Sequence, residues 1–92
     1  MAKGMAIVAT EHGSRYLQQL CKHWAHKFSV EFTPQNGRID MGEGRIVTMS
    51  AGEKALTINV EADNLERMQE VVADHIVRFA FRENLTFDWR SI

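Results

Sequence analysis

The stretch "LTINVEADNLERMQEVVADHIVRF" at residues 56–79 changes its hydrophobic period halfway along its length. In the first part, apolar residues alternate with polar ones, which is typical of a β-strand with one buried face. After Asp63, apolar residues recur three or four positions apart, as they do on one side of an α-helix. This helix is expected to bury Leu65, Met68, Val72, Ile76 and Phe79. Asp63 and Glu66 have the spacing of a capping-box variant that would begin the helix.

Three further alternating runs precede this stretch, at residues 28–33, 38–41 and 45–50. Each run has the length of one strand and places apolar residues at alternate positions, as a strand over a core does. Asn36-Gly37 is a strong hairpin signal between the first two runs. Gly42-Glu43-Gly44 predicts the next turn. Together with the strand that opens the quoted stretch, the runs predict four consecutive antiparallel strands.

The N-terminal part of the chain predicts one more strand and one more helix. Residues 5–9 are a short apolar run, and Thr10 is a suitable N-cap for a helix that ends near Lys27. The apolar side of this helix carries Leu17, Leu20, Cys21, Trp24 and Phe28. The order strand, helix, four strands, helix predicts an α+β two-layer sandwich, with an antiparallel meander sheet and both helices on one face. That succession resembles the topology of the TATA-binding-protein-like fold, a likeness that carries no function.

Length and composition exclude several classes of protein. The 92 residues suffice for one core, so residues 1–92 are expected to form a single domain. A formal net charge of -1 argues against nucleic-acid binding, which requires a basic excess. The uncharged stretches are too short to cross a bilayer, so no membrane partner is expected. The single cysteine cannot form an internal disulfide, which fits a cytoplasmic protein.

Polar and aromatic residues follow the side of the first predicted helix that lies opposite its apolar side. They recur at spacings of three or four residues and are His12, Tyr16, Gln19, His23 and His26. We interpret them as a face for a ligand or a partner, together with His75 on the second helix and Trp89 near the C-terminus. For His75, the favoured interpretation is an imidazole that flanks the core and bonds to a carbonyl group, and the alternative is a pocket residue that meets the first helix.

The spacing of the histidines and the cysteine does not favour metal binding or catalysis. His23 and His26 lie three residues apart on one helix, and two ligands in this arrangement make a poor metal site. Cys21 lies on the apolar side of the helix and is expected to be an inert core thiol. We therefore assign no catalytic residue, no metal ligand and no cofactor. The sequence favours a protein that is not an enzyme.

Two long strings resemble a known bacterial family. They are "RYLQQLCKHWAHKFSVEF" at residues 15–32 and "VVADHIVRFAFRENLTFDW" at residues 71–89, and they are similar to domain-of-unknown-function family number 2218. The resemblance covers nearly the whole chain and implies no reaction and no site residue. Because some relatives lie near or are joined to siderophore-interacting reductases, the resemblance implies an accessory role in iron acquisition.

These observations leave three hypotheses for the function. The first is a cytosolic accessory protein that binds a small molecule or a protein partner, with a link to iron–siderophore utilisation. The second is a metal-binding protein or an enzyme that uses His23, His26 or His75. The third is a homodimeric structural module that buries its histidine face or its C-terminal segment between subunits.

Overall fold

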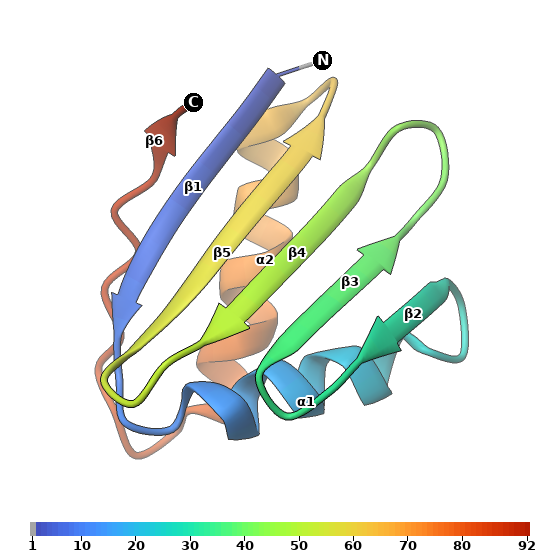
Figure 1. The fold of residues 1–92 in the computed structure, drawn as a ribbon. Helices are drawn as coiled ribbons and strands as arrows, with labels where there is room; N and C mark the ends of the chain where they lie inside the picture. The colour runs from blue at the N-terminus through green and yellow to red at the C-terminus, as the bar shows by residue number, and fades with distance from the viewer. Residues whose placement is uncertain (1) are drawn as a thin grey trace.

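The computed structural model describes residues 2–92, which form six strands and two helices (Figure 1). The elements in chain order are β1 (Ala2–Ala9), α1 (Gly13–Trp24), β2 (Ser29–Phe32), β3 (Asn36–Asp40), β4 (Ile46–Ala51), β5 (Ala55–Ala62), α2 (Leu65–Phe79) and β6 (Arg90–Ser91). This order is the predicted one, with the two-residue strand β6 added at the end. The predicted α+β class is confirmed.

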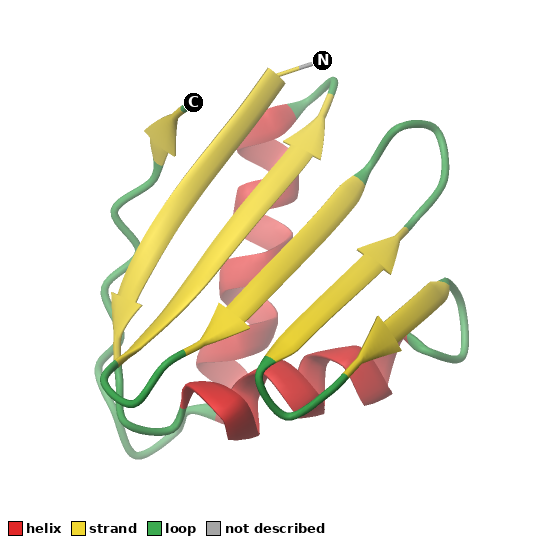
Figure 2. Ribbon diagram, viewed as in Figure 1, coloured by secondary structure: helices red, strands yellow, loops and turns green. Residues whose placement is uncertain are grey.

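One antiparallel sheet has the strand order β2-β3-β4-β5-β1-β6 (Figure 2). Both helices pack on the same face of the sheet, but they cover different strands. Helix α1 packs mainly on β3 and β4, whereas α2 packs on β5 and β1. The two helices therefore meet only near one end of the sheet, and this divergence leaves part of the helix-covered face open.

The core lies between the helices and the sheet, where the predicted apolar sides meet. Leu17, Leu20 and Cys21 of α1 are fully buried, as are the alternating residues Leu56 and Ile58 of β5. The core of α2 consists of Met68, Val72 and Ile76, whereas Leu65 and Phe79 are only partly buried and lie at its edge. The predicted apolar sides of both helices are thus correct, apart from the two ends of the α2 side and Phe28, which is partly buried and lies beyond the end of α1.

The prediction of a turn at Asn36-Gly37 is wrong, because both residues belong to β3. The hairpin between the two runs is present, but the chain turns two residues earlier, at Pro34-Gln35, where the Thr33 N–H donates to the Asn36 carbonyl oxygen at 2.7 Å. The reason for a glycine at position 37 is packing against α1. A Cβ atom at Gly37 would lie 2.9 Å from Cys21 Sγ, closer than side-chain contacts allow.

The predicted turn at Gly42-Glu43-Gly44 is confirmed. All three residues have positive φ, at 81°, 57° and 78°. Such backbone favours glycine, because a Cβ atom clashes with the neighbouring carbonyl group in the left-handed region. Two of the three positions are glycine, and this turn carries the chain from β3 into β4.

Both helices begin differently from the prediction. Helix α1 starts at Gly13 after His12, which makes no side-chain cap, and Thr10 Oγ1 instead accepts the His12 N–H at 3.0 Å. Helix α2 is capped by Asn64, whose side-chain oxygen accepts the Arg67 N–H at 3.3 Å. The predicted cap residue, Asp63, lies one position too early. The predicted end near Lys27 also differs, since α1 ends at Trp24 and continues only as a turn.

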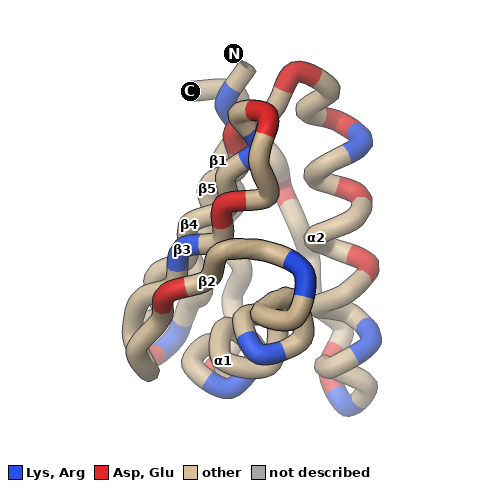
Figure 3. Tube along the Cα trace, turned by 90° about the vertical axis from the view of Figure 1, so that its right-hand side faces the viewer, with Lys and Arg blue, Asp and Glu red and all other residues tan. Residues whose placement is uncertain are grey.

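The C-terminal segment closes one side of the sandwich. Leu85, Phe87 and Trp89 are partly buried against the core, and β6 pairs with β1 at the edge of the sheet. Seen edge-on, after a quarter turn about the vertical axis, the sheet and α2 form two layers with α1 at their lower end (Figure 3). Among residues 2–92, neither helix combines the length and the apolar character needed to span a membrane.

Candidate binding groove

A groove of about 580 Å³ opens where the two helices diverge. Its walls are the C-terminal end of α1, the β3–β4 turn and the N-terminal two-thirds of α2, and we call it the interhelix groove. The C-terminal segment fills the space beside β1, but no element fills the corresponding space beside β4 in the described part of the chain. The groove is therefore a consequence of the way in which the helices divide the sheet between them.

Aromatic rings form the wall of the groove at the α1 side. Trp24 is only 5% exposed, and its ring centroid lies 4.9 Å from that of His75. The His23 ring lies 5.2 Å from His75, and Phe28 meets Trp24 edge to face at 6.2 Å. Such a cluster presents flat, polarisable faces and favours planar or apolar ligands.

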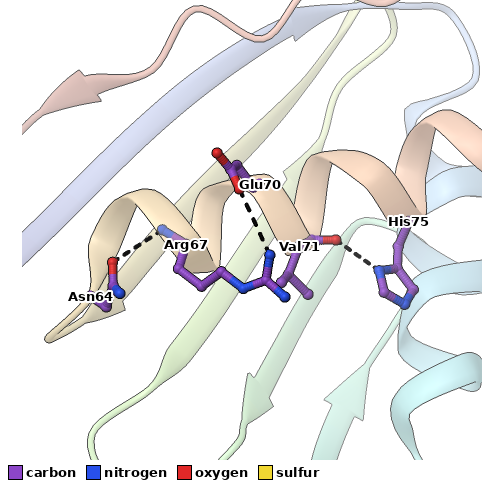
Figure 4. A network of polar contacts seen from close by, with 5 residues as sticks. All are labelled: Asn64, Arg67, Glu70, Val71 and His75. Carbon is purple, nitrogen blue, oxygen red and sulfur yellow. Dashed lines mark hydrogen bonds and ion pairs between the residues drawn. The ribbon is translucent and has the colours of Figure 1, made fainter.

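His75 is held by the backbone of its own helix. Its Nδ1 atom lies 2.7 Å from the Val71 carbonyl oxygen (Figure 4). A carbonyl oxygen only accepts hydrogen bonds, so Nδ1 carries the proton and, in the neutral ring, the lone pair lies on Nε2. The bond to a carbonyl group that the favoured interpretation expected is thus present, and the ring also lines the groove and meets α1, as the alternative expected.

Three cationic side chains, Lys27, Arg45 and Arg67, surround the groove, together with the two carboxylates of Glu43 and Asp63. Arg45 is oriented by the backbone, because its Nη2 donates to the Met41 carbonyl at 2.7 Å and its Nε donates to the Gly42 carbonyl at 3.2 Å. Arg67 lies 3.8 Å from Glu70 in a solvent-exposed pair, and such pairs contribute little. The rim therefore has a small excess of positive charge.

Only two of the predicted site residues meet in the interhelix groove. His23 and His75 both line the interhelix groove. Gln19 on α1, His12 just before this helix and His26 in the turn after it are exposed and lie outside the groove. Trp89 lies in the C-terminal segment and stacks with Phe87. The groove residues that were not predicted as site residues include Trp24, Lys27, Arg45 and Arg67. No local pattern marks them, because they come from three separate segments of the chain.

Tyr16 does not lie on the exposed side of α1, and this part of the predicted face is wrong. Its side chain is 4% exposed, and its hydroxyl donates to the Glu83 carboxylate. Thr10 Oγ1 donates to the same carboxylate at 3.0 Å. Burial and the neighbouring Glu83 raise the pKa of Tyr16 to about 12. The hydrogen bond from Tyr16 is also the main reason that the pKa of Glu83 is lowered.

This Thr10–Tyr16–Glu83 network lies outside the interhelix groove and has a structural role. It ties the start of α1 to the segment that follows α2, across 67 residues of sequence. The sequence does not indicate this network, because no pattern connects a tyrosine in one helix with a glutamate beyond the other. The network explains why Tyr16 turns toward the protein although it follows the spacing of the polar side.

Cys21 is completely buried beneath α1, and burial raises the pKa of its thiol to about 11. It does not line the interhelix groove. Across residues 2–92, no group of three or more His, Cys, Asp or Glu side chains is arranged to hold a metal ion. The groove thus combines aromatic rings, cations and a pair of imidazoles, without a complete metal site made of protein ligands.

Fold and groove together define a small two-layer α+β protein with one side of its sandwich closed and the other side hollowed. The chain belongs to the DUF2218 family, described as "Uncharacterized protein conserved in bacteria", whose model matches residues 5–90. It is similar to PA4090 from Pseudomonas aeruginosa, whose NMR structure has 39% sequence identity and a TM-score of 0.81. That match covers 98% of this chain and 96% of PA4090. No curated protein matches the chain.

Proposed function

We propose that this protein is a non-catalytic accessory module that binds a small organic molecule in the interhelix groove. The observation that carries the proposal is the groove itself, with a volume of about 580 Å³. Small-molecule sites in proteins have volumes of roughly 300–1,000 Å³ and combine apolar walls with a few polar groups. The buried Met41 and Met68 supply apolar surface, and methionine adapts to ligands of irregular shape.

The chemistry of the lining favours a planar, anionic ligand. His23 and His75 offer ring surface to a conjugated molecule, and the nearly buried Trp24 ring supports them from behind. Lys27 and Arg45 can bind a carboxylate or phenolate, and the two backbone hydrogen bonds of Arg45 reduce the entropy lost on binding. Glu43 and Asp63 disfavour ligands that carry several negative charges.

We further propose iron–siderophore utilisation as the setting of this activity, as the family resemblance implied. A catecholate siderophore is aromatic and anionic, which suits the lining of the groove. The shared chemistry is that of a dihydroxyaromatic acid, and it can be supplied by the free acid or by its ferric complex. The experiment below distinguishes these two sources.

The proposal is tested by titrating a Trp89→Phe variant with dihydroxybenzoate, its ferric complex and the neutral amide. The chain contains two tryptophans, so this variant leaves Trp24 in the groove wall as the single indole fluorophore. We expect saturable changes in Trp24 fluorescence and in the amide resonances of groove residues. The acid should bind more tightly than the amide, because only the acid uses the cationic rim.

Two arginine variants control for the location of binding. Arg67→Gln removes a cation of the groove, whereas Arg82→Gln removes an exposed arginine that stacks on Phe81 outside the groove. We expect Arg67→Gln to weaken binding of the acid and Arg82→Gln to leave it unchanged. Equal affinities in both variants, or resonance shifts confined to other surfaces, would contradict the proposal. Binding of the acid but not of its ferric complex would remove the siderophore part alone.

A further inference from the structure

Two imidazoles from different helices meet at one end of the interhelix groove. His23 lies in the last turn of α1 and His75 in the C-terminal half of α2, and their ring centroids are 5.2 Å apart. Imidazoles that share one tetrahedral ion, at metal–nitrogen distances of about 2.1 Å, have ring centroids roughly 5 Å apart. We propose that His23 and His75 together bind a divalent late transition-metal ion, such as Cu²⁺ or Zn²⁺.

The hydrogen bond of His75 prepares its ring as a ligand. Because Nδ1 donates to the Val71 carbonyl at 2.7 Å, Nε2 is the atom with a free lone pair, and the ring hangs from α2 on the side of α1 (Figure 4). Histidines that bind metals almost always donate their other ring N–H to a carbonyl or a carboxylate, which fixes the orientation of the ring. The half-buried His75 is thus the preset ligand, and the exposed His23 adjusts to it.

The proposed pair of ligands, His23 and His75, differs from the pair His23 and His26 that the sequence spacing suggested. His26 is also exposed, in the turn after α1, but it does not line the groove and makes no ring contact with His75 among the described residues. A third protein ligand is likewise absent from the described part of the chain. The ion therefore has two ligands from the protein and keeps its other coordination positions for water or for a ligand in the groove.

These open positions connect the ion to the proposed function. An anionic molecule held by the cationic rim can place an oxygen on the ion, which would strengthen its binding in the groove. This consequence rests on the proposed function, whereas binding of the ion to His23 and His75 does not. The nearby Lys27 and Arg67 repel a free cation, so we expect modest affinity and tighter binding of Cu²⁺ than of Zn²⁺.

The test uses the full chain without a histidine tag, freed of metal with a chelator that is then removed. Cu²⁺ is titrated by quenching of Trp24 in the Trp89→Phe background, since the Trp24 ring lies 4.9 Å from His75. Zn²⁺ is titrated by the shift in melting temperature and by the imidazole resonances of the protein. We compare His23→Gln and His75→Gln with the matched control His26→Gln.

We expect His26→Gln to bind each ion with the same affinity as the parent protein does. Either groove variant should lose more than about tenfold in affinity, because a second ligand acts at high effective concentration. His23 is exposed, so its variant folds and keeps the test decisive even where His75→Gln does not fold. Absence of binding to the parent protein, unchanged binding in His23→Gln, or a loss specific to His26→Gln would overturn the inference.

The two proposals fail separately. Metal binding is measured without any organic molecule, and the dihydroxybenzoate titration is repeated with chelator present. Metal binding without ligand binding would leave this inference standing and remove the proposed function. Ligand binding without metal binding would leave the proposed function standing and remove this inference.

Discussion

At the scale of single residues, Cys21 illustrates how position determines reactivity. Its thiol is fully buried beneath α1, and burial raises its pKa to about 11, so the reactive thiolate is scarce at neutral pH. We predict that native protein reacts slowly with an aromatic disulfide reagent, at a rate limited by opening of the structure. Full denaturation should restore the rate of a free cysteine.

The control for this prediction is the dependence of the labelling rate on denaturant. A rate that follows the unfolded fraction supports a buried, inert thiol. Fast labelling of the native protein, with a rate that does not change at low denaturant, would contradict it. The sequence predicted this burial correctly, because Cys21 shares the helical spacing of Leu17, Leu20 and Trp24.

His75 and Tyr16 show what sequence spacing leaves undecided about single residues. The structure combines the two alternative interpretations of His75, because its ring bonds to a carbonyl group and also meets His23 of α1. Tyr16 follows the spacing of the polar side of α1 but turns inward to Glu83. A tyrosine side chain suits either the surface or the interior, because its ring is apolar and its hydroxyl needs only one hydrogen-bond partner. The choice therefore depends on whether a partner is available in the folded protein.

At the scale of the elements, Gly37 allows α1 to approach β3 closely. A Cβ atom at this position would lie 2.9 Å from Cys21 Sγ and 3.2 Å from Leu17 Cδ2. We predict that Gly37→Ala destabilises the protein by about 1–3 kcal/mol, as overpacking of a core does. The free energy of unfolding, measured with urea, tests this.

Two variants make the Gly37 prediction specific. Gly52→Ala adds the same methyl group where the nearest atom is 3.6 Å away, and it should cost little. Replacing Cys21 by Ala removes the sulfur atom, so Gly37→Ala should be less costly in a Cys21→Ala background. Equal costs in both backgrounds would show that the contact with sulfur is not the cause.

The start of α2 gives a second prediction at this scale. Asn64 caps the helix by accepting the Arg67 N–H, so Asn64→Ala should lower the free energy of unfolding by about 1 kcal/mol. Asp63→Ala should cost less, since Asp63 provides only its charge near the helix N-terminus. Urea denaturation of both variants decides between the observed cap and the one expected from sequence. The reverse order of costs would favour Asp63 as the cap.

At the scale of the whole molecule, the Glu83 carboxylate joins the start of α1 to the segment after α2. Hydrogen bonding by Tyr16 lowers the pKa of Glu83 in the folded state below the unfolded value of about 4.3. The unfolded state therefore binds a proton first as the pH falls. The stability that this difference contributes is present above about pH 4.3 and is lost as the pH falls through the folded pKa.

We predict that Glu83→Gln flattens the acid side of the stability profile, because the amide does not titrate. The measurement is the urea midpoint of both proteins between about pH 6 and pH 3, a range that spans the carboxyl titration. Glu53→Gln, in the exposed turn before β5, serves as the control and should keep the slope of the parent protein. Equal slopes for the parent protein and Glu83→Gln would show that Glu83 does not contribute.

The sequence by itself determined the elements of this protein and most of its core. Hydrophobic period depends on local backbone geometry, so a period of two and a period near 3.6 identify strands and helices without knowledge of the fold. The same local logic predicted the turn at residues 42–44 and the burial of Cys21 and Trp24. It failed at Asn36-Gly37, where a glycine is required by a helix distant in sequence and not by a turn.

Only the tertiary structure decided where the groove lies and which residues meet in it. The interhelix groove exists because α1 and α2 cover different strands, and helix direction over a sheet is set by the packing of side chains distant in sequence. That packing brings Lys27, Arg45 and Arg67 to one rim and His23 to His75. These residues lie in separate segments of the chain. Contacts between separate segments leave no periodic pattern in the sequence from which they could be predicted.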